Sequence, residues 1–591
     1  MSPKTYSQQA SLLIAAVAAL GLAPAMRGQV EWTANSVVDF TWNNAANWNP
    51  GVPTLTDDVF FGFTVPNPGA LPNPSQITLG AGSLANSLHF AGSYQLLGGT
   101  LQLGSGVIRA DLGTTSLIGA ELTGATGLTK VGGGAVFLGN VANSYTGITT
   151  INNGSLVISS PAALGMDTSA VIVNGAATRG FGGGSLVLDG LNGGMTFARD
   201  LVLQGYGPIA DRSAALVALG SNEISGAISM AGGLVSTRMS AINGTLTLSG
   251  SLDVAGTAGT TISGLGSAAN AAGVSNYLLT GAITGTGTLE KTGVGTLWLN
   301  PSDTSGFSGI VRVGQSATGT TSTVRITTPN VLGTRTTTGT GGVFDLNTGT
   351  LEIRMDAPSI LAGGLAANMY QRASSTIFVD HSIGGSAVNG TAAFGQLAFE
   401  DNITLTLNSR NGYGASFTTA PVVGSTAGDN NSTITNNMGG VLSFTGNFWS
   451  NANNTGNRTM TIGGNGNSII NGNVIASAAA FNHNLTKSGS GQLAITGTGS
   501  TLDGTVSISG GTLAITDFRS ITNNTSAINI GSSTTTGTLS IGTATAATLA
   551  GLTTSKVVNL AGTTGGAIIN ASQTQVFPVT FNANFTATGA G

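Results

Sequence analysis

One eleven-residue pattern occurs three times in this chain and limits the folds open to it more than any other feature. The copies run from Leu128 to Leu138, from Leu289 to Leu299 and from Leu485 to Ile495. All three follow the form Leu-[Thr/Glu]-Lys-x-Gly-x-Gly-x-[Val/Leu]-x-[Leu/Ile]. Internal repetition of this kind is typical of a solenoid, in which similar units stack and each covers the core of its neighbour.

The lysine of the pattern is its rarest residue type. The chain holds five lysines, and three of them, Lys130, Lys291 and Lys487, occupy the same position of the pattern. Two interpretations are open. Each lysine could be a solvated residue that ends a strand before the Gly-x-Gly turn. Alternatively, the three could form a row of surface cations that contacts an anionic glycan or lipopolysaccharide.

A second shared block follows each copy, as Tyr145-Thr146-Gly147, Phe307-Ser308-Gly309 and Leu502-Asp503-Gly504. The residues between the copies contain short segments in which apolar and polar residues alternate, bounded by Gly or Asn. Four such segments are Thr100–Leu103, Ser155–Ile158, Thr245–Leu248 and Thr512–Ile515. Period-two alternation between turn residues predicts short strands with one buried face.

Composition agrees with an all-β chain. Of 591 residues, 92 are glycine, 40% are hydrophobic and only 7% are charged, against about 25% charged in average soluble domains. Disorder usually requires few apolar residues and a high net charge, whereas the net charge here is -4. With 19 basic residues in the chain, no basic stripe is available for nucleic-acid phosphates. The absence of cysteine excludes disulfides and thiol chemistry.

The spacing of equivalent strands selects the architecture. Val136 and Leu156 occupy like positions 20 residues apart in the first copy, as do Leu493 and Leu513 in the third. We therefore expect a right-handed parallel β-helix with coils of roughly 20 residues, on the order of 25 in all at about 4.8 Å each. A sandwich of hairpin-linked strands is the rival fold, but it gives no reason for the 20-residue offset.

Stacking is also required energetically. One coil buries four or five aliphatic side chains, each contributing about 1.5–3 kcal/mol. Fixing the backbone of 20 residues costs roughly 20–40 kcal/mol. A single coil is therefore not expected to fold without neighbours on both sides.

Residues 1–25 have the order of a bacterial secretory signal. Lys4 precedes a mostly apolar run from Ala10 to Leu22, and Ala23-Pro24-Ala25 supplies a small-x-small cleavage site. The run is shorter than the roughly 20 apolar residues that a membrane-spanning helix needs. We expect cleavage after Ala25 and export of the chain.

The mature start is rich in tryptophan. Trp32, Trp42 and Trp48 lie close together, although the chain has five tryptophans in all. An open solenoid end needs a cap over its core and strand edges. We therefore divide the chain into a signal peptide (1–25), a cap with the first coils (26–65) and a β-helix (66–591). An aromatic sugar-binding platform is the alternative role for the tryptophans.

Candidate catalytic groups are few. Glu352, Arg354 and Asp356 alternate along one strand and so share a face, which is typical of a solvated surface with local ion pairs. Asp380-His381-Ser382 contains the residue types of a catalytic triad, but sequence neighbours rarely form one. The segment Gly463–Ser468 imitates a calcium-binding repeat without its aspartate, and we interpret it as a turn. We predict no catalytic, cofactor-binding or metal-binding residue.

The repeated block resembles the autotransporter-associated β-strand repeat, also called the passenger-associated transport repeat. The resemblance lies in Gly127–Gly139, Asn143–Gly147, Gly154–Leu156 and Ala163-Leu164-Gly165 of the first copy. We place the copies at residues 127–165, 287–333 and 484–516. The third copy departs from the family in having Leu502 in place of the aromatic residue. The opening with Asn47-Trp48 and Asp57–Phe60 is also similar to many chains of this family.

The resemblance implies an exported, right-handed β-helical passenger, often an adhesin-like surface protein of a Gram-negative-type bacterium. It implies passage across the outer membrane, with the repeat assisting transport and folding. Family members usually end in a membrane β-barrel or a sorting tail, and neither is recognisable at Thr586–Gly591. We therefore expect either a truncated sequence or a released protein. The expected partners are the export machinery or a missing barrel domain, with glycans or other cell-surface polymers outside the cell.

We accordingly predict a non-enzymatic structural or adhesin-like protein, extracellular or at the outer-membrane surface, that needs no cofactor. Two alternatives stay open. One is a polysaccharide-active β-helical enzyme, which would need several titratable side chains converging in a groove. The other is a structural stalk for a module beyond residue 591.

Overall fold

A computed structural model describes most of the chain after residue 27. The described residues are 28–36, 38–62, 75–176, 182–208, 214–230, 236–254, 260–264, 276–314, 322–327, 344–356, 368–400, 402–419, 430–448, 457–475, 482–521, 526–542, 552–562, 565–571 and 578–587. The predicted signal peptide, 1–25, and the end of the second copy, 328–333, lie outside them. The chain divides into two compact units: Met1–Ile148 with Ala162–Asp167, and Thr149–Pro161 with Thr168–Gly591.

Unit 1 contains two stacks of short strands. The first stack runs in the order β2 (Trp48–Asn49), β1 (Gln29–Trp32), β3 (Asp58–Phe61), β5 (Ser83–Phe90), β7 (Thr100–Ala110) and β10 (Leu128–Val131), and β9 (Glu121–Thr123) also pairs with β7. The second stack is β4 (Gln76–Thr78), β6 (Gln95–Leu97), β8 (Thr115–Ile118) and β11 (Ala135–Leu138). The described pairs are parallel except β1 with β2, which is antiparallel.

Unit 2 contains three parallel stacks. The first is β12 (Thr149–Ile151), β14 (Val171–Asn174), β17 (Leu201–Gln204), β20 (Ile228–Met230), β23 (Leu252–Asp253) and β26 (Ile283–Thr284). The second is β13 (Gly154–Ile158), β15 (Gly184–Gly190), β18 (Leu216–Gly220), β21 (Thr237–Ile242), β24 (Thr260–Gly264), β27 (Thr288–Thr292), β29 (Ile310–Val313), β31 (Phe344–Leu346), β33 (Met369–Gln371), β35 (Thr391–Phe399), β37 (Gly414–Thr419), β39 (Leu442–Phe444), β41 (Ser468–Ile470), β43 (Gln492–Ile495), β45 (Gly511–Ile515), β47 (Gly537–Ile541) and β50 (Ala567–Ala571).

The third stack of unit 2 is a 16-stranded sheet. Its strands are β16 (Thr196–Phe197), β19 (Asn222–Ile224), β22 (Thr245–Leu248), β25 (Asn276–Leu279), β28 (Gly295–Leu299), β30 (Ser322–Ile326), β32 (Thr350–Arg354), β34 (Ser375–Asp380), β36 (Thr404–Ser409), β38 (Asn430–Asn437), β40 (Arg458–Gly463), β42 (His483–Lys487), β44 (Val506–Ile508), β46 (Ile528–Ile530), β49 (Val558–Leu560) and β52 (Phe585–Ala587). A further pair is β48 (Thr553–Thr554) with β51 (Thr580–Phe581), and short 3-10 helices include Ala45–Asn47, Pro161–Leu164 and Phe518–Ser520.

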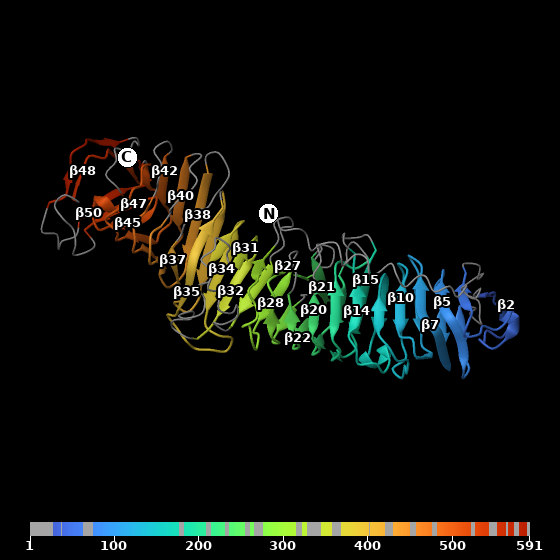
Figure 1. The fold of residues 1–591 in the computed structure, drawn as a ribbon. Helices are drawn as coiled ribbons and strands as arrows, with labels where there is room; N and C mark the ends of the chain where they lie inside the picture. Colours follow the sequence, from blue (N-terminus) through green and yellow to red (C-terminus); the bar gives the residue numbers. More distant parts are fainter. Residues whose placement is uncertain are drawn as a thin grey trace, which may run out of the picture. The chain divides into compact units, whose positions relative to one another are not determined.

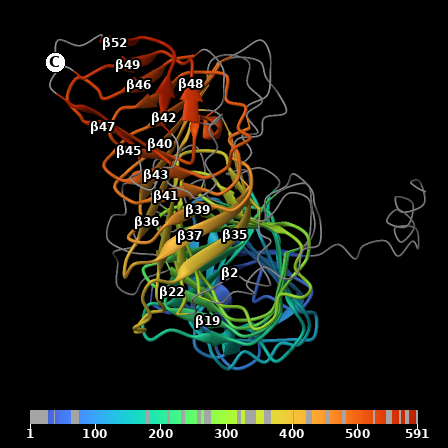
Figure 2. The same cartoon turned by 90° about the vertical axis from the view of Figure 1, so that its left-hand side faces the viewer.

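These pairings confirm the predicted all-β parallel solenoid. In unit 2 each strand pairs with strands of the preceding and following turns rather than with its neighbours in sequence. Figure 1 shows β28, β32 and β34 of this unit running side by side, and Figure 2 shows the turns from β35 to β47 one behind another. Hairpin-linked sandwich strands, the rival prediction, would pair antiparallel.

The strands form where the sequence alternates. The four segments predicted from the sequence all lie in strands, within β7, β13, β22 and β45. In β22, Leu246 and Leu248 are fully buried, whereas Thr245 and Thr247 between them are half-buried on the opposite face. The inward Leu, Ile and Val side chains make a continuous apolar interior, and the outward positions carry mostly Thr, Ser and Asn.

The turn length differs from the expected value over much of the chain. Leu493 pairs directly with Leu513, so the 20-residue offset of the third copy is confirmed. Elsewhere the turns are longer: Leu156 pairs with Leu186, 30 residues on, and Val313 with Leu346, 33 residues on. The extra residues lie between strands, where loops lengthen a turn without changing strand register. The expectation of about 25 coils of one length was therefore wrong.

The tryptophans form a buried cluster at the β1–β2 end of unit 1. Trp48 lies edge-on to Trp32 and to Trp42, with ring centroids 4.9 and 4.8 Å apart, and Phe61 extends the cluster. Trp48 Nε1 donates to the Trp42 carbonyl at 2.5 Å. All three indoles are at most 5% exposed. A sugar-binding platform needs exposed ring faces, so the structure contradicts that alternative and supports the cap.

We expect Trp48→Ala to destabilise unit 1 by about 3–5 kcal/mol, because it removes a buried ring from an aromatic cluster. Thermal unfolding measures the loss. Phe137→Ala is the matched control, since Phe137 belongs to the same unit but is 37% exposed, and we expect a change within about 1 kcal/mol. Equal melting temperatures for wild type and Trp48→Ala would contradict the cap.

Candidate functional site

The three repeat lysines, the one predicted surface contact, lie inside the solenoid. Lys130 and Lys291 are 0% exposed and Lys487 is 2% exposed. They sit at inward positions of β10, β27 and β42, two residues after the buried Leu128, Leu289 and Leu485. Both sequence interpretations, a solvated strand end and a row of surface cations, were therefore wrong.

Each lysine holds the glycine turn that follows it. Lys130 Nζ donates to the carbonyls of Val131 and Gly132, both at 2.8 Å. Lys291 Nζ donates to the carbonyls of Thr292 at 2.8 Å and Gly293 at 2.9 Å.

Lys487 repeats this geometry, donating to the carbonyls of Ser488 at 2.5 Å and Gly489 at 3.0 Å. In all three copies the lysine thus bonds the same two carbonyls, one and two residues ahead. The turn requires the glycine, because Gly132, Gly293 and Gly489 have φ values of 75°, 70° and 70°. The rare lysine is explained by these bonds to turn carbonyls that would otherwise be buried without a partner.

Burial also changes the protonation of these amines. It lowers the pKa of Lys130 and of Lys291 from 10.5 to about 7, and the pKa of Lys487 to about 8. The cause is loss of hydration of the ammonium form. A neutral amine still has two N–H donors for the two shared carbonyls, so the turn remains bonded in either form.

The second repeat block is also part of the core. Tyr145, Phe307 and Leu502 occupy its first position in the three copies and are 2%, 3% and 0% exposed. The leucine of the third copy therefore fills the place of an aromatic ring inside the coil. The repeat motif consequently accounts for folding of the coil and presents none of these side chains to a ligand.

The polar side chains that do reach the surface form regular rows on the 16-stranded sheet. We call the longest row the outer column. It has one residue from each of ten successive strands, β16 to β38: Thr196, Glu223, Thr247, Leu278, Trp298, Arg325, Glu352, Phe378, Asn408 and Asn437. Parallel strands lie about 4.8 Å apart, so the column samples the surface at that interval.

Two further rows are uncharged. The threonine column, from β28 to β38, has a threonine on each strand: Thr296, Thr323, Thr350, Thr376, Thr406 and Thr435. The hydroxyl–amide column, from β36 to β52, consists of Thr404, Thr433, Thr461, Thr486, Ser507, Asn529, Asn559 and Thr586. Side chains bond along it, as where Asn559 Nδ2 donates to Asn529 Oδ1 at 3.2 Å.

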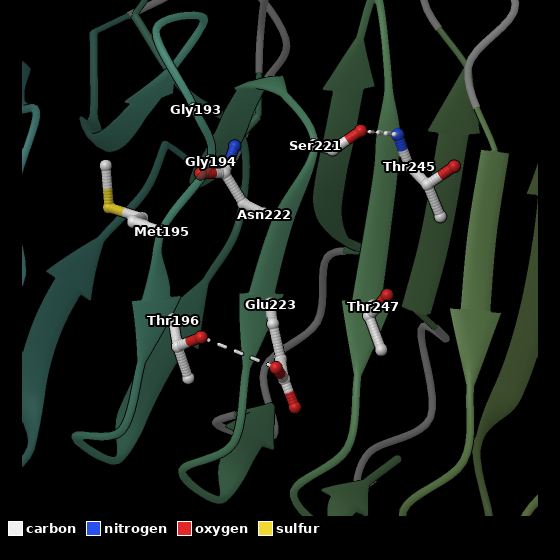
Figure 3. Close-up of a pocket in the computed structure, with 9 residues that line it drawn as sticks. All are labelled: Gly193, Gly194, Met195, Thr196, Ser221, Asn222, Glu223, Thr245 and Thr247. Atoms are coloured by element: carbon white, nitrogen blue, oxygen red, sulfur yellow. Dashed lines mark hydrogen bonds between the residues drawn. The ribbon is translucent and has the colours of Figure 1, made fainter.

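A hollow of about 370 Å³ lies at the β16 end of the outer column (Figure 3). It is lined by Gly193, Gly194, Met195, Thr196, Ser221, Asn222, Glu223, Thr245 and Thr247. Small-molecule sites span about 300–1,000 Å³, so the hollow is large enough for a ligand. In Figure 3, Thr196, Glu223 and Thr247 lie next to one another on three neighbouring strands.

Glu223 is the single ionisable group among these lining residues. It is half-buried, and its carboxylate accepts from Ser249 Oγ at 2.5 Å and from Thr196 Oγ1 at 3.4 Å. A carboxylate has about four lone-pair positions, so it retains acceptor capacity toward the hollow. One carboxylate among hydroxyls can bind donors but does not supply the pair of acid and base that hydrolysis uses.

Further along the outer column the charges neutralise one another. Arg325 Nε donates to Glu352 at 2.8 Å, and Arg354 bridges Glu352 at 2.6 Å and Asp380 at 2.7 Å. The predicted stripe of Glu352, Arg354 and Asp356 is therefore part of a paired network that crosses turns. Guanidinium groups also cover the aromatic rings: Arg325 lies 5.5 Å from Trp298 and Arg354 lies 5.0 Å from Phe378.

The neighbouring residues Asp380, His381 and Ser382 do not form a triad. Ser382 Oγ donates to Asp356 at 2.5 Å, and His381 Nδ1 contacts the Ser382 carbonyl at 2.6 Å instead of its hydroxyl. Within the described residues, no group of three His, Asp or Glu side chains is placed to hold a metal ion. The same residues contain no helix with the length and apolar character needed to cross a membrane.

Comparison with known proteins supports the repeat. The family model described as the passenger-associated-transport-repeat matches residues 128–158 and 485–515. The chain is a β-helical protein with passenger-type repeats. The second copy, at 287–333, lies outside both matches, yet Lys291 bonds its turn as Lys130 and Lys487 do.

A curated protein shares part of the sequence of this repeat protein. The adhesin BmaC autotransporter of Brucella suis biovar 1 (strain 1330) is 32% identical over 200 residues. The match covers 32% of this chain and 5% of the adhesin. The chain thus corresponds to a small portion of that much longer protein.

We expect the buried lysines to make stability rise with pH. Lys291 has a pKa of about 7 folded and 10.5 unfolded, so between these values the unfolded chain binds more protons, and raising the pH favours folding. The limiting slope is about 1.4 kcal/mol per pH unit for each lysine. Urea unfolding from pH 7 to 10 measures it.

Lys291→Met should reduce this slope and lower stability at pH 7 by about 1–3 kcal/mol, because it leaves turn carbonyls without a donor. Lys291→Arg is the companion variant, since it keeps donors but does not titrate in this range. An unchanged slope in both variants would contradict the assignment of the buried amine as the titrating group.

Proposed function

We propose that this chain is an exported, non-enzymatic passenger-type protein that acts outside the cell or at the outer-membrane surface as an adhesin-like scaffold. The observation that supports it most is the 16-stranded sheet, which presents rows of Thr, Ser and Asn side chains in register over many turns. Such a face offers many weak hydrogen bonds to a large partner. The autotransporter adhesin that shares part of the sequence supports the same role.

The charged groups favour binding over catalysis. General acid–base catalysis needs titratable groups that converge on a substrate with free capacity. Glu352 and Asp380 are bound by Arg354, and Glu223 is the single titratable residue of its hollow. We therefore prefer a scaffold over the polysaccharide-active enzyme. The stalk alternative concerns a module outside this chain.

Transport is the part of the proposal that the repeats support. Passenger-type chains reach the surface through an outer-membrane barrel, so we propose this route, with residues 1–25 directing the first export step. Folding outside suits the solenoid, because each turn is stabilised by stacking on a turn already formed.

Export is tested with residues 1–25 fused to alkaline phosphatase, which becomes active only after leaving the bacterial cytoplasm. We expect phosphatase activity, because the positive start and apolar core are those of a secretory signal. The matched control fuses residues 26–50 and should be inactive. Equal activity from both fusions would contradict the signal peptide.

Adhesion is tested with inert beads coated with the purified chain and applied to surfaces carrying collagen, fibronectin, mucin, cellulose or chitin. We expect adherence to one or more surfaces above that of albumin-coated beads, with no sugar released from the polysaccharides. Adherence to none of them would count against the scaffold. Released sugar that disappears in Glu223→Gln would favour the enzyme.

A further inference from the structure

The hollow and the adjoining outer column form one continuous surface. Thr247 of the hollow is in register with Leu278, which is in register with Trp298. Glu223 and Trp298 are three strands apart, a distance of about 14 Å at the usual strand spacing. This stretch therefore combines a polar hollow with two half-buried apolar side chains, and its length suits a chain molecule that lies across the strands.

The hollow is built to accept hydroxyl donors. Four of its lining residues, Thr196, Ser221, Thr245 and Thr247, carry hydroxyl groups, and Glu223 supplies a carboxylate. An added side-chain carbon at Gly193 would meet nothing within 4 Å, so the rim is open at that turn. Hydroxyl and carboxylate acceptors close to an apolar surface match a sugar, which has several hydroxyls and apolar C–H faces.

Charge selects among sugars. The lining residues include one carboxylate and no basic residue, so an acidic glycan or a phosphate would be repelled. The cations further along the outer column, Arg325 and Arg354, are already paired with Glu352 and Asp380. An uncharged glycan meets no repulsion and can donate to Glu223.

We propose that the surface from the hollow at Glu223 to Trp298 binds a linear, uncharged polysaccharide that runs across the strands. One sugar sits in the hollow with hydroxyls bonded to Glu223, and the following sugars contact Leu278 and Trp298. This inference rests on the proposed adhesin-like function and names the class of polymer that is bound.

The test uses the purified chain and isothermal titration with four hexasaccharides. Cellohexaose, N-acetylchitohexaose and mannohexaose are uncharged, and hexagalacturonate is the acidic comparator. We expect at least one uncharged hexasaccharide to bind, with little dependence on salt because no ion pair forms. Absence of binding by all three, or tighter binding of hexagalacturonate, would overturn the proposal.

Glu223→Gln and Glu223→Ala should each weaken that binding by about tenfold or more, because a hydrogen bond to a charged acceptor is lost. Trp298→Ala should weaken it as well. The matched control is Glu121→Ala, since Glu121 is also half-buried and accepts from a serine, Ser144 Oγ, at 2.6 Å. Its affinity should stay within about twofold.

Equal affinity in Glu223→Gln and wild type would place the glycan elsewhere and refute the site. Glu223→Gln has nearly the same shape as wild type, so folding can be checked by its melting temperature. If coated beads adhere and Glu223→Gln or free hexasaccharide has no effect, the adhesin-like function stands and this inference fails. If the hexasaccharide binds but beads adhere to no surface, the adhesin-like function fails.

Discussion

Hydrogen bonding between successive turns is the constraint on which the whole structure depends. A strand of three to five residues cannot satisfy its own backbone donors and acceptors, and in unit 2 it pairs with the turns before and after it. The same stacking covers the apolar interior, where Leu246, Leu289 and Leu493 are fully buried. The chain is stable without disulfides because each turn supplies both the partners and the cover that its neighbours need.

The repeat motif solves a problem that stacking creates. Where a strand ends in a tight Gly-x-Gly turn, backbone carbonyls point into the interior and cannot reach water. The repeat lysine donates to two of them from inside the coil, as Lys291 does to Thr292 and Gly293. A motif that identifies the family is thus a device for closing turns, and it leaves the outer surface free to vary.

The outer surface is therefore where the recognition chemistry lies. Regular strand spacing turns single outward residues, such as Thr296 and Thr323, into rows with a constant interval. The paired network around Arg354 holds the middle of the outer column close to neutrality, and the hollow at Glu223 adds one unshared charge at its end. A neutral, repetitive surface matches a neutral, repetitive partner.

Local pattern in the sequence was enough to determine the strands, the parallel stacking and the 20-residue offset between Leu493 and Leu513, because alternation reports directly which side chains are buried. It also contained an unused signal for the lysines: Lys130 follows Leu128 by two residues and must share its inward face. The outer column was beyond sequence reasoning. Trp298 and Arg325 are 27 residues apart, whereas Phe378 and Asn408 are 30 apart. Loops of unequal length remove any fixed period, so only backbone pairing between turns decides which residues become neighbours.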